Sequence, residues 1–332
     1  MFKLAVFSSK PYVKDMFNTY NQNSDFDIVY LKENLNSNTA YLAKGFENVC
    51  LFVNDFADKE TLKILKDSGC KLIALRCAGF NNVDIITAKE MSLPVVRVTA
   101  YSPYAVAEHA FSLLLSLNRK IHRAYQRGRN GNFSIDGLLG FDLHGKVMGV
   151  IGTGKIGLIF IKIALGFGMK VKAYDLYPKL EEAKSLGFDY VALDDLYKDS
   201  DIIALHCPLT PLNYHLINAD AIEKMKDNVY IINTSRGGLI KTIDLIDSLK
   251  NNKIGAVGLD VYEEEEKYFF EDLSLQPGIQ DDILSRLLSF KNVIITAHQA
   301  FFTKEALDKI TSTTFENIKA YHEQNVLLNS VY

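Results

Sequence analysis

Several side chains suited to acid–base or anion-binding chemistry follow strand-like runs in the second half of the chain. They are Arg236 after residues 229–233, Asp260 and Glu265 after residues 256–259, and His298 after residues 293–296. Because the carboxyl ends of parallel strands meet at one edge of a sheet, we expect these side chains to lie close together. A guanidinium can bind a carboxylate through two parallel hydrogen bonds, and an imidazole can exchange a proton near neutral pH.

A glycine-rich turn in the middle of the chain indicates a nucleotide-binding unit. Residues 147–151 resemble a strand buried on both faces, and they run into GTGKIG at 152–157 and then into a helical pattern. Gly152 permits a tight strand-to-helix turn, Gly154 lets the backbone approach a pyrophosphate, and Gly157 lets the helix pack against the strand. The N-terminus of that helix then offers N–H groups to the phosphates.

A carboxylate at the end of the next strand-like run indicates which dinucleotide is bound. Asp175 ends residues 170–175, 23 positions after Gly152. A carboxylate there can accept hydrogen bonds from both ribose hydroxyls of NAD and would repel the 2′-phosphate of NADP. Leu176 and Tyr177 follow it, rather than an arginine, which favours NAD. The alternative is an ordinary βαβ turn with a surface aspartate.

Hydride transfer between NAD and a 2-hydroxy or 2-oxo acid is the chemistry that fits these residues. Arg236 would bind the substrate carboxylate, and His298 would give a proton to the carbonyl oxygen in reduction and take it in oxidation. Glu265 is the candidate carboxylate that favours the charged imidazole. Asp260 would steady either the nicotinamide or the His–Glu pair. No metal is required, because no His/Cys/Asp cluster has the spacing of a ligand set.

Each of these residues also has a purely structural interpretation. Arg236 could pair with a loop carboxylate, His298 could cap the segment after it, and Asp260 could cap a helix. Glu265 lies in the run 263–266, in which its neighbours on both sides compete for the same role.

The strands that must position these residues alternate with helical patterns. In the second half they are expected at 147–151, 170–175, 201–206, 229–233, 256–260 and 293–296, the six strands of a complete doubly wound Rossmann sheet. In the first hundred residues, strands are expected at 2–7, 49–53, 71–75 and 95–98, with helices at 10–20, 59–66 and 83–91. A long helix is expected from Tyr104 to about Arg123, with Pro103 at its first turn, and a last one at about 303–323.

Bulk composition excludes several functional classes. A length of 332 residues suits two domains, and a net charge of −3 argues against binding of nucleic acid or an anionic membrane. No apolar run approaches the ~18 residues of a membrane span. The four cysteines form no C-x-x-C pair, so we expect reduced thiols in a cytoplasmic protein.

Motifs spread through nearly the whole chain resemble the D-isomer-specific 2-hydroxyacid dehydrogenases, and most closely the bacterial fermentative D-lactate dehydrogenases among them. They are LRCAGFNNVD (75–84), YSPYAVAEH (101–109), GTGKIG (152–157), HCPLT (206–210), NTSRG (233–237), GLDVYE (258–263), QDD (280–282) and TAHQAF (296–301).

The resemblance implies two α/β domains. One is a flavodoxin-like catalytic domain of residues 1–100 and 299–332, and the other is a Rossmann NAD-binding domain of residues 101–298. These domains would close over the substrate at hinges near Tyr101 and Gln299. It also implies a homodimer through residues 103–140, or a higher homo-oligomer, and NADH-dependent, reversible reduction of pyruvate to D-lactate in the cytoplasm.

The resemblance also implies roles for individual residues. Arg236 would bind the carboxylate, His298 would be the acid/base and Glu265 its partner. Substrate would contact Cys77, Ala78, Gly79, Tyr101, Arg236 and Phe301. The cofactor would contact Gly152, Thr153, Gly154, Lys155, Ile156, Gly157, Asp175, His206, Cys207, Pro208, Asn213, Thr234, Ser235, Arg236, Asp260 and His298.

Two other functions fit the same sequence. A dehydrogenase for a bulkier 2-oxo acid would use the same chemistry, although the aromatic Tyr101 and Phe301 suggest a small pocket. An NAD-sensing corepressor is a binding protein with this fold, but the chain lacks added tails or basic segments.

Overall fold

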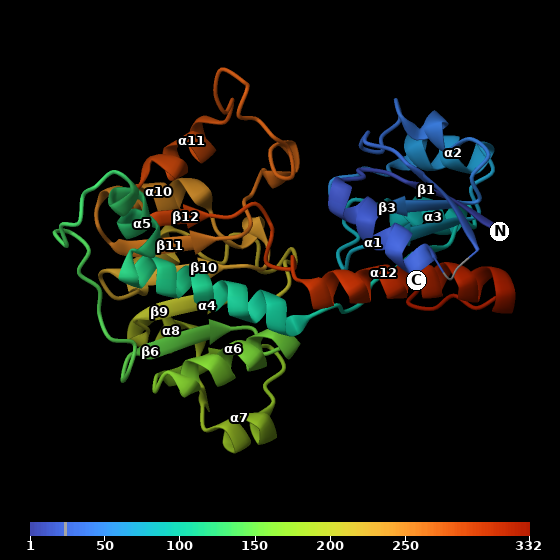
Figure 1. The fold of residues 1–332 in the computed structure, drawn as a ribbon. Coiled ribbons are helices and arrows are strands. Elements are labelled where there is room, and N and C mark those ends of the chain that lie inside the picture. The colour runs from blue at the N-terminus through green and yellow to red at the C-terminus, as the bar shows by residue number, and fades with distance from the viewer. Residues whose placement is uncertain (23–24) are drawn as a thin grey trace. The chain divides into compact units, whose positions relative to one another are not determined.

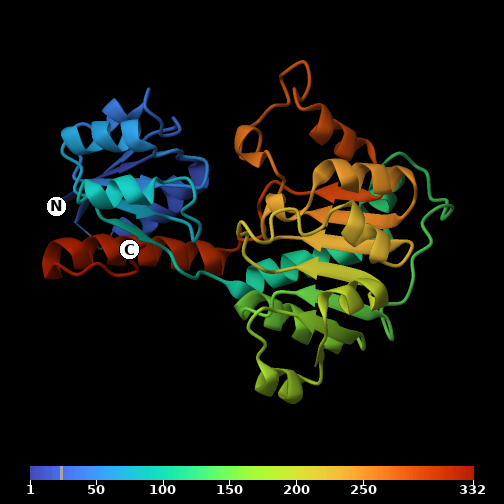
Figure 2. The ribbon, with the colours of Figure 1, turned by 180° about the vertical axis from the view of Figure 1, so that it is seen from behind.

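The chain divides into two compact units in a computed structural model, which describes residues 1–22 and 25–332 (Figures 1 and 2). Unit 1 consists of Met1–Ser102 and Phe302–Tyr332, and unit 2 of Pro103–Phe301. The division differs by two or three residues from the expected one, which ended the first segment at 100 and began the last at 299. One reason is that the backbone N–H groups of Gln299 and Ala300 donate to the Asp260 carboxylate, which ties both residues to unit 2.

Unit 1 is built on a five-stranded parallel sheet. Its elements are β1 (Phe2–Val6), α1 (Pro11–Asn21), β2 (Phe26–Tyr30), the 3-10 helix η1 (Ala40–Ala43), β3 (Asn48–Leu51), α2 (Lys59–Asp67), β4 (Leu72–Leu75), α3 (Ile85–Glu90), β5 (Val95–Arg97) and α12 (Lys304–Gln324). The strand order is β2-β1-β3-β4-β5, which is the flavodoxin-like order.

The C-terminal helix α12 completes the core of unit 1. Phe315 of α12 lies edge-on to Phe17 of α1 and Phe26 of β2, with ring centroids 5.2 and 4.5 Å apart. Phe315 and Ile318 are fully buried in this cluster. Loss of α12 would therefore expose one face of the unit 1 sheet.

Unit 2 is built on a seven-stranded parallel sheet. Its elements are α4 (Pro103–Arg119), α5 (Ile121–Arg129), β6 (Val147–Ile151), α6 (Lys155–Gly166), β7 (Lys170–Tyr174), α7 (Leu180–Leu186), β8 (Asp189–Tyr190), α8 (Leu193–Asp199), β9 (Ile202–Leu205), α9 (Ala219–Lys224), β10 (Val229–Asn233), the 3-10 helix η2 (Gly237–Leu239), α10 (Thr242–Lys250), β11 (Ile254–Leu259), the 3-10 helix η3 (Glu265–Lys267), α11 (Asp282–Ser289) and β12 (Val293–Ile295). The order β12-β11-β10-β9-β6-β7-β8 is doubly wound, with the switch point between β6 and β9.

Helices cover both faces of the unit 2 sheet. One core contains α4, α6 and Ala183 of α7, and Figure 1 shows α4 crossing in front of the strands. The other core contains residues of α8, α9, α10 and α11. The predicted fold class, two α/β domains with a Rossmann and a flavodoxin-like sheet, is confirmed. Among the described helices, none has both the length and the apolar surface needed to span a bilayer.

The sequence analysis missed two strands and misjudged the end of one helix. The missed strands are β2 and β8. The helix expected to run from Tyr104 to about Arg123 breaks at Lys120, whose backbone is left-handed with φ +50°. Two residues before the break, the Asn118 side chain hydrogen-bonds the backbone N–H and carbonyl of Phe141 and so holds a distant loop against the end of α4.

Candidate active site

The glycine turn between β6 and α6 has the geometry that its sequence predicts. Gly152 adopts φ +99°, and a Cβ atom there would lie 2.5 Å from the backbone nitrogen of Cys207. A Cβ at Gly157 would lie 2.0 Å from the Gly152 carbonyl oxygen. A Cβ at Gly154, in contrast, would have no atom within 4 Å, so this position offers open space beside the turn.

Asp175 is held against the glycine turn by three hydrogen bonds. Its carboxylate accepts the Thr153 N–H at 2.6 Å, the Thr153 hydroxyl at 3.0 Å and the Tyr177 N–H at 2.8 Å. Burial alone would raise the pKa of this carboxyl, but these donors hold its pKa below the ordinary value. The Tyr190 hydroxyl lies 2.7 Å from that of Thr153 and accepts the Lys179 N–H at 3.0 Å, which links the turn to the segment after β7.

The residues around the turn fit a dinucleotide. Helix α6 starts at Lys155 and Ile156, and Gly154 provides no side-chain cap for its first N–H groups. The Thr234 hydroxyl, at the end of β10, is buried without a hydrogen-bond partner among the described residues. Free N–H groups, open space at Gly154 and an unsatisfied hydroxyl are what a bound pyrophosphate and nicotinamide end would use.

The loop after β9 packs below the glycine turn. The His206 ring lies at 50° to the ring of Phe160, with the centroids 4.7 Å apart. Complete burial lowers the pKa of the imidazole to about 3, so this histidine is neutral. Burial raises the pKa of the Cys207 thiol to about 11, so the thiol is protonated at neutral pH. The Asn213 side chain donates to the Pro208 carbonyl at 2.8 Å and closes the loop.

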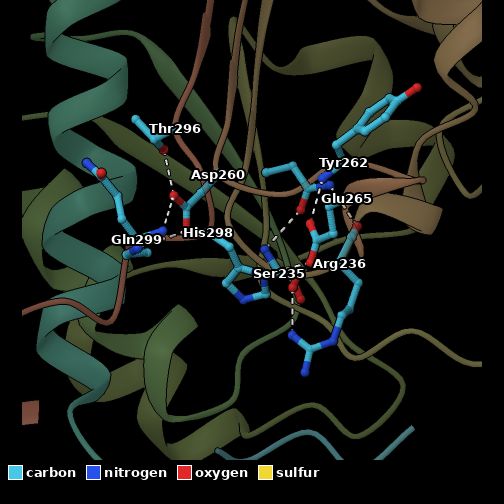
Figure 3. Close-up of polar contacts among 10 residues, drawn as sticks. Ser235, Arg236, Asp260, Tyr262, Glu265, Thr296, His298 and Gln299 are labelled. Atoms are coloured by element: carbon cyan, nitrogen blue, oxygen red, sulfur yellow. Dashed lines mark hydrogen bonds and ion pairs between the residues drawn. The ribbon is translucent and has the colours of Figure 1, made fainter. Parts of the chain in front are cut away.

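His298 and Glu265 form a direct pair. The Nδ1 atom of His298 lies 2.7 Å from Oε1 of Glu265, and the two side chains are 21% and 19% exposed. The other carboxylate oxygen, Oε2, accepts the Tyr262 N–H at 2.8 Å, which fixes its orientation (Figure 3). The neighbouring Glu263 has a different use, because it accepts from Thr242 and pairs with His215.

Arg236 lies on the loop that follows β10, next to the loop that carries Glu265 (Figure 3). The Asn233 side chain accepts the Ser235 N–H at 3.0 Å and donates to the Arg236 carbonyl at 2.9 Å, so it folds this turn. The Arg236 guanidinium donates to the Ser235 carbonyl at 2.7 Å. A Cβ at Gly237 would lie 2.1 Å from the Tyr262 carbonyl carbon, so only glycine lets the two loops approach this closely.

Asp260 is fully buried, and its backbone carbonyl accepts the His298 N–H at 2.8 Å. Its carboxylate accepts the Thr296 hydroxyl at 2.6 Å and the N–H groups of Gln299 and Ala300 at 2.9 Å each (Figure 3). The structure thus brings Arg236, Glu265, His298 and Asp260 to one edge of the unit 2 sheet, where the strands end.

The other residues expected to contact substrate lie partly in unit 1. Cys77 is buried and its thiol donates to the Gly79 carbonyl at 3.3 Å, while Arg97 donates to the Ala78 carbonyl at 2.7 Å. Tyr101 is the last residue but one of the first segment of unit 1. Phe301 is the last residue of unit 2 and is 7% exposed.

Four residues that support these groups were not predicted from the sequence. Tyr190 supports the cofactor side, and Tyr262, Thr296 and His109 support the His298 side. No motif contains Tyr190, and Tyr262 acts through its backbone. His109 and Thr296 stand in separate motifs, 187 positions apart, so nothing in the sequence pairs them.

Comparison with known proteins places these features in context. The protein-family model described as "D-isomer specific 2-hydroxyacid dehydrogenase, NAD binding domain" matches residues 111–300 of this chain. The chain is 53% identical over 316 residues to D-lactate dehydrogenase of Escherichia coli, covering 95% of both chains. It is also similar to the solved pyruvate reductase of Chlamydomonas reinhardtii, with TM-score 0.94, 45% identity and coverage of 99% and 98%. The D-lactate dehydrogenase of Lactobacillus jensenii, solved with NAD⁺, has TM-score 0.83, 30% identity and coverage of 100% of both chains.

Proposed function

We propose, because this chain belongs to the D-isomer-specific 2-hydroxyacid dehydrogenases, that it reduces pyruvate to D-lactate with NADH, and that the reaction is reversible. The family makes it an NAD-dependent oxidoreductase. The observation that carries the proposal is the His298–Glu265 pair at 2.7 Å beside the loop of Arg236.

His298 is the proton donor in this proposal. Its Nδ1 atom is engaged by Glu265, so Nε2 is the atom that faces the carbonyl oxygen. The Glu265 carboxylate pairs with Nδ1 and keeps the ring in one orientation. When bound, NADH would supply the hydride, and His298 would give its proton from Nε2 to the carbonyl oxygen. In the reverse direction the same nitrogen takes the proton from the 2-hydroxyl group.

Arg236 provides the anchor for the substrate carboxylate. One of its nitrogens already donates to the Ser235 carbonyl, which holds the planar guanidinium in place. The remaining donors can bind both oxygens of a carboxylate side by side. With the carboxylate held by Arg236 and the carbonyl oxygen facing His298, one face of the 2-oxo carbon would be presented to the hydride, which is the basis of a single product chirality.

The other substrate contacts expected from the sequence remain part of this proposal. The backbone of Cys77, Ala78 and Gly79 would help to hold the carboxylate, and Tyr101 and Phe301 would line the pocket. The Arg97 bond to the Ala78 carbonyl supports a fixed shape for the first of these segments.

The cofactor residues expected from the sequence keep that assignment as part of the proposal. Asp175 would bind the adenine ribose, and residues 152–157 with the start of α6 would bind the pyrophosphate. Three donors already orient the Asp175 carboxylate toward the turn, which supports a preference for NADH over NADPH.

We also propose a cytoplasmic homodimer or higher homo-oligomer with a role in fermentation. The loop after α5 supports an oligomer, because Phe133, Ile135 and Leu139 are 82%, 83% and 87% exposed there. Light scattering at micromolar concentration should give a multiple of the 37.4 kDa chain mass, and a monomer would contradict this part.

A panel of 2-oxo acids with NADH tests the proposed activity. Pyruvate should give the highest kcat/KM, and chiral chromatography should find D-lactate. L-lactate as the product would refute the proposal. Strong preference for a branched-chain or phenyl 2-oxo acid would favour the bulkier-substrate dehydrogenase, and NADH binding without turnover of any acid would favour an NAD-sensing protein.

A further inference from the structure

The buried Asp260 carboxylate is connected to a histidine of another element. Besides accepting from Thr296, Gln299 and Ala300, the Asp260 carboxylate contacts His109, whose Nε2 atom lies 3.4 Å from Oδ1. His109 lies on α4 and its side chain is 19% exposed, whereas that of Asp260 is fully buried. The same Nε2 atom lies 3.0 Å from the Thr296 hydroxyl.

The direction of these hydrogen bonds can be worked out from the donors available. A hydroxyl has one proton, and the 2.6 Å contact to a carboxylate takes it, so the Thr296 hydroxyl donates to Asp260. The Thr296 oxygen can then only accept from His109, so Nε2 of His109 carries a proton. The chain of donation therefore runs from His109 to Thr296 to Asp260.

Hydrogen bonds to Asp260 also hold the backbone of residues 298–300. The His298 N–H donates to the Asp260 carbonyl at 2.8 Å, and the next two N–H groups, of Gln299 and Ala300, donate to the Asp260 carboxylate. His298 itself has φ +51°, a left-handed conformation that a residue with a Cβ holds only when its surroundings impose it. The Asp260 contacts are the surroundings that do so.

We propose that His109 is a positioning residue for His298. By donating to Thr296 and contacting Asp260, it fixes the orientation of both groups, and these fix the backbone from which the His298 ring is presented. Loss of the His109 donor would let the Thr296 hydroxyl and the carboxylate rotate, and the ring of His298 would lose its alignment with the substrate. This inference rests on the proposed function, in which His298 is the proton donor.

Two variants of His109 separate a positioning role from packing. His109→Leu keeps most of the side-chain volume and removes the N–H donor. His109→Gln keeps an N–H donor that can reach the place of Nε2. His144→Leu is the matched control, since His144 is an exposed histidine of the same unit outside this network.

Steady-state kinetics with NADH give the first readout. Because misplacement by about 1 Å can cost up to 10²-fold, we expect His109→Leu to lower kcat by about tenfold or more. The affinity for NADH, measured by fluorescence titration, should change less than about twofold. The kinetic isotope effect with NADH deuterated at the transferred position should increase, because proton and hydride transfer become slower than product release. His109→Gln should recover kcat to within about threefold of the wild type.

A second readout needs no turnover. The ring-proton NMR signal of His298, identified by its absence in His298→Gln, should move in His109→Leu and return in His109→Gln. If pyruvate is not a substrate, the kinetics use the 2-oxo acid that ranks first, so failure of the proposed function is seen in the wild type alone. Wild-type kcat with an unmoved signal in His109→Leu would refute the positioning role. Equal damage in the Leu and Gln variants, or a loss of thermal stability without change in kcat, would assign His109 to packing.

Discussion

Replacement of Glu265 by glutamine tests the central pair of the site. The Glu265 carboxylate accepts through both oxygens, from His298 Nδ1 at 2.7 Å and from the Tyr262 N–H at 2.8 Å. In glutamine an NH2 group replaces one of these two oxygens, and it cannot accept from the donor that faces that position. Glu265→Gln therefore keeps the volume of the side chain but removes the negative charge and one of the two acceptors.

The size of the effect follows from the type of bond that is lost. A hydrogen bond to a charged group contributes about 1.5–3 kcal/mol, and both side chains here are about four-fifths buried, so solvent weakens it only in part. Since about 1.4 kcal/mol corresponds to a factor of ten in rate, we expect kcat/KM for pyruvate to fall roughly 10- to 150-fold. Most of this loss should appear in kcat, because the charge of His298 matters as the proton is transferred.

The measurement is NADH oxidation followed by absorbance in the wild type, in Glu265→Gln and in Glu266→Gln. The last variant makes the same charge change one residue away, on an exposed side chain. It should retain the wild-type rate, and both variants should bind NADH normally. A loss of less than about threefold in Glu265→Gln, or an equal loss in Glu266→Gln, would refute the assignment of Glu265 as the partner of His298.

Three further predictions concern the cofactor side and stability. Asp175→Ala removes the charge that repels a 2′-phosphate, so the ratio of kcat/KM with NADPH to that with NADH should rise by about tenfold, as expected for ~1.4 kcal/mol, and an unchanged ratio would contradict its role. Gly157→Ala places a Cβ 2.0 Å from a carbonyl oxygen of the turn and should cost about 1–3 kcal/mol in unfolding free energy and weaken NADH binding, whereas Gly166→Ala on the same helix meets nothing within 4 Å and should do neither. Burial alone would raise the pKa of the Asp201 carboxyl, but hydrogen bonds from the Val147 N–H and from Lys226 hold its pKa below the ordinary value. The contribution of this carboxylate to the free energy of unfolding is therefore present above about pH 4 and is lost as the pH falls further. Denaturant unfolding should find Asp201→Asn less stable than the wild type at pH 7, with the difference shrinking in acid.

Elements with a strong local pattern could be predicted from the sequence. The strands at 147–151 and 229–233 occur with the expected bounds, because each is a short run of apolar residues buried on both faces. The glycine turn was equally predictable, since a Cβ at Gly152 or Gly157 would collide with neighbouring backbone, while Gly154 leaves open space beside the turn.

Elements that depend on distant contacts could not be predicted. The edge strand β2 alternates buried and exposed residues and exists by pairing with β1, and β8 has only two residues. The break at Lys120 has no glycine or proline to signal it, and the Asn118–Phe141 hydrogen bonds beside it join residues 23 positions apart.

The site divides in the same way. The ends of β10, β11 and β12 could be chosen from the sequence because their residue types, Arg, Asp and His, suit one reaction. The sequence could not show which glutamate of 263–266 pairs with His298. The 3-10 helix there starts at Glu265, and the direction of the Glu265 side chain depends on its bond with the Tyr262 N–H. The Glu263 side chain is already occupied by His215 and Thr242. Glu263 accepts from Thr242 at the start of α10, and Glu265, two positions later, pairs with His298. The choice is therefore made by which donors surround the run, which is information that only the folded chain contains.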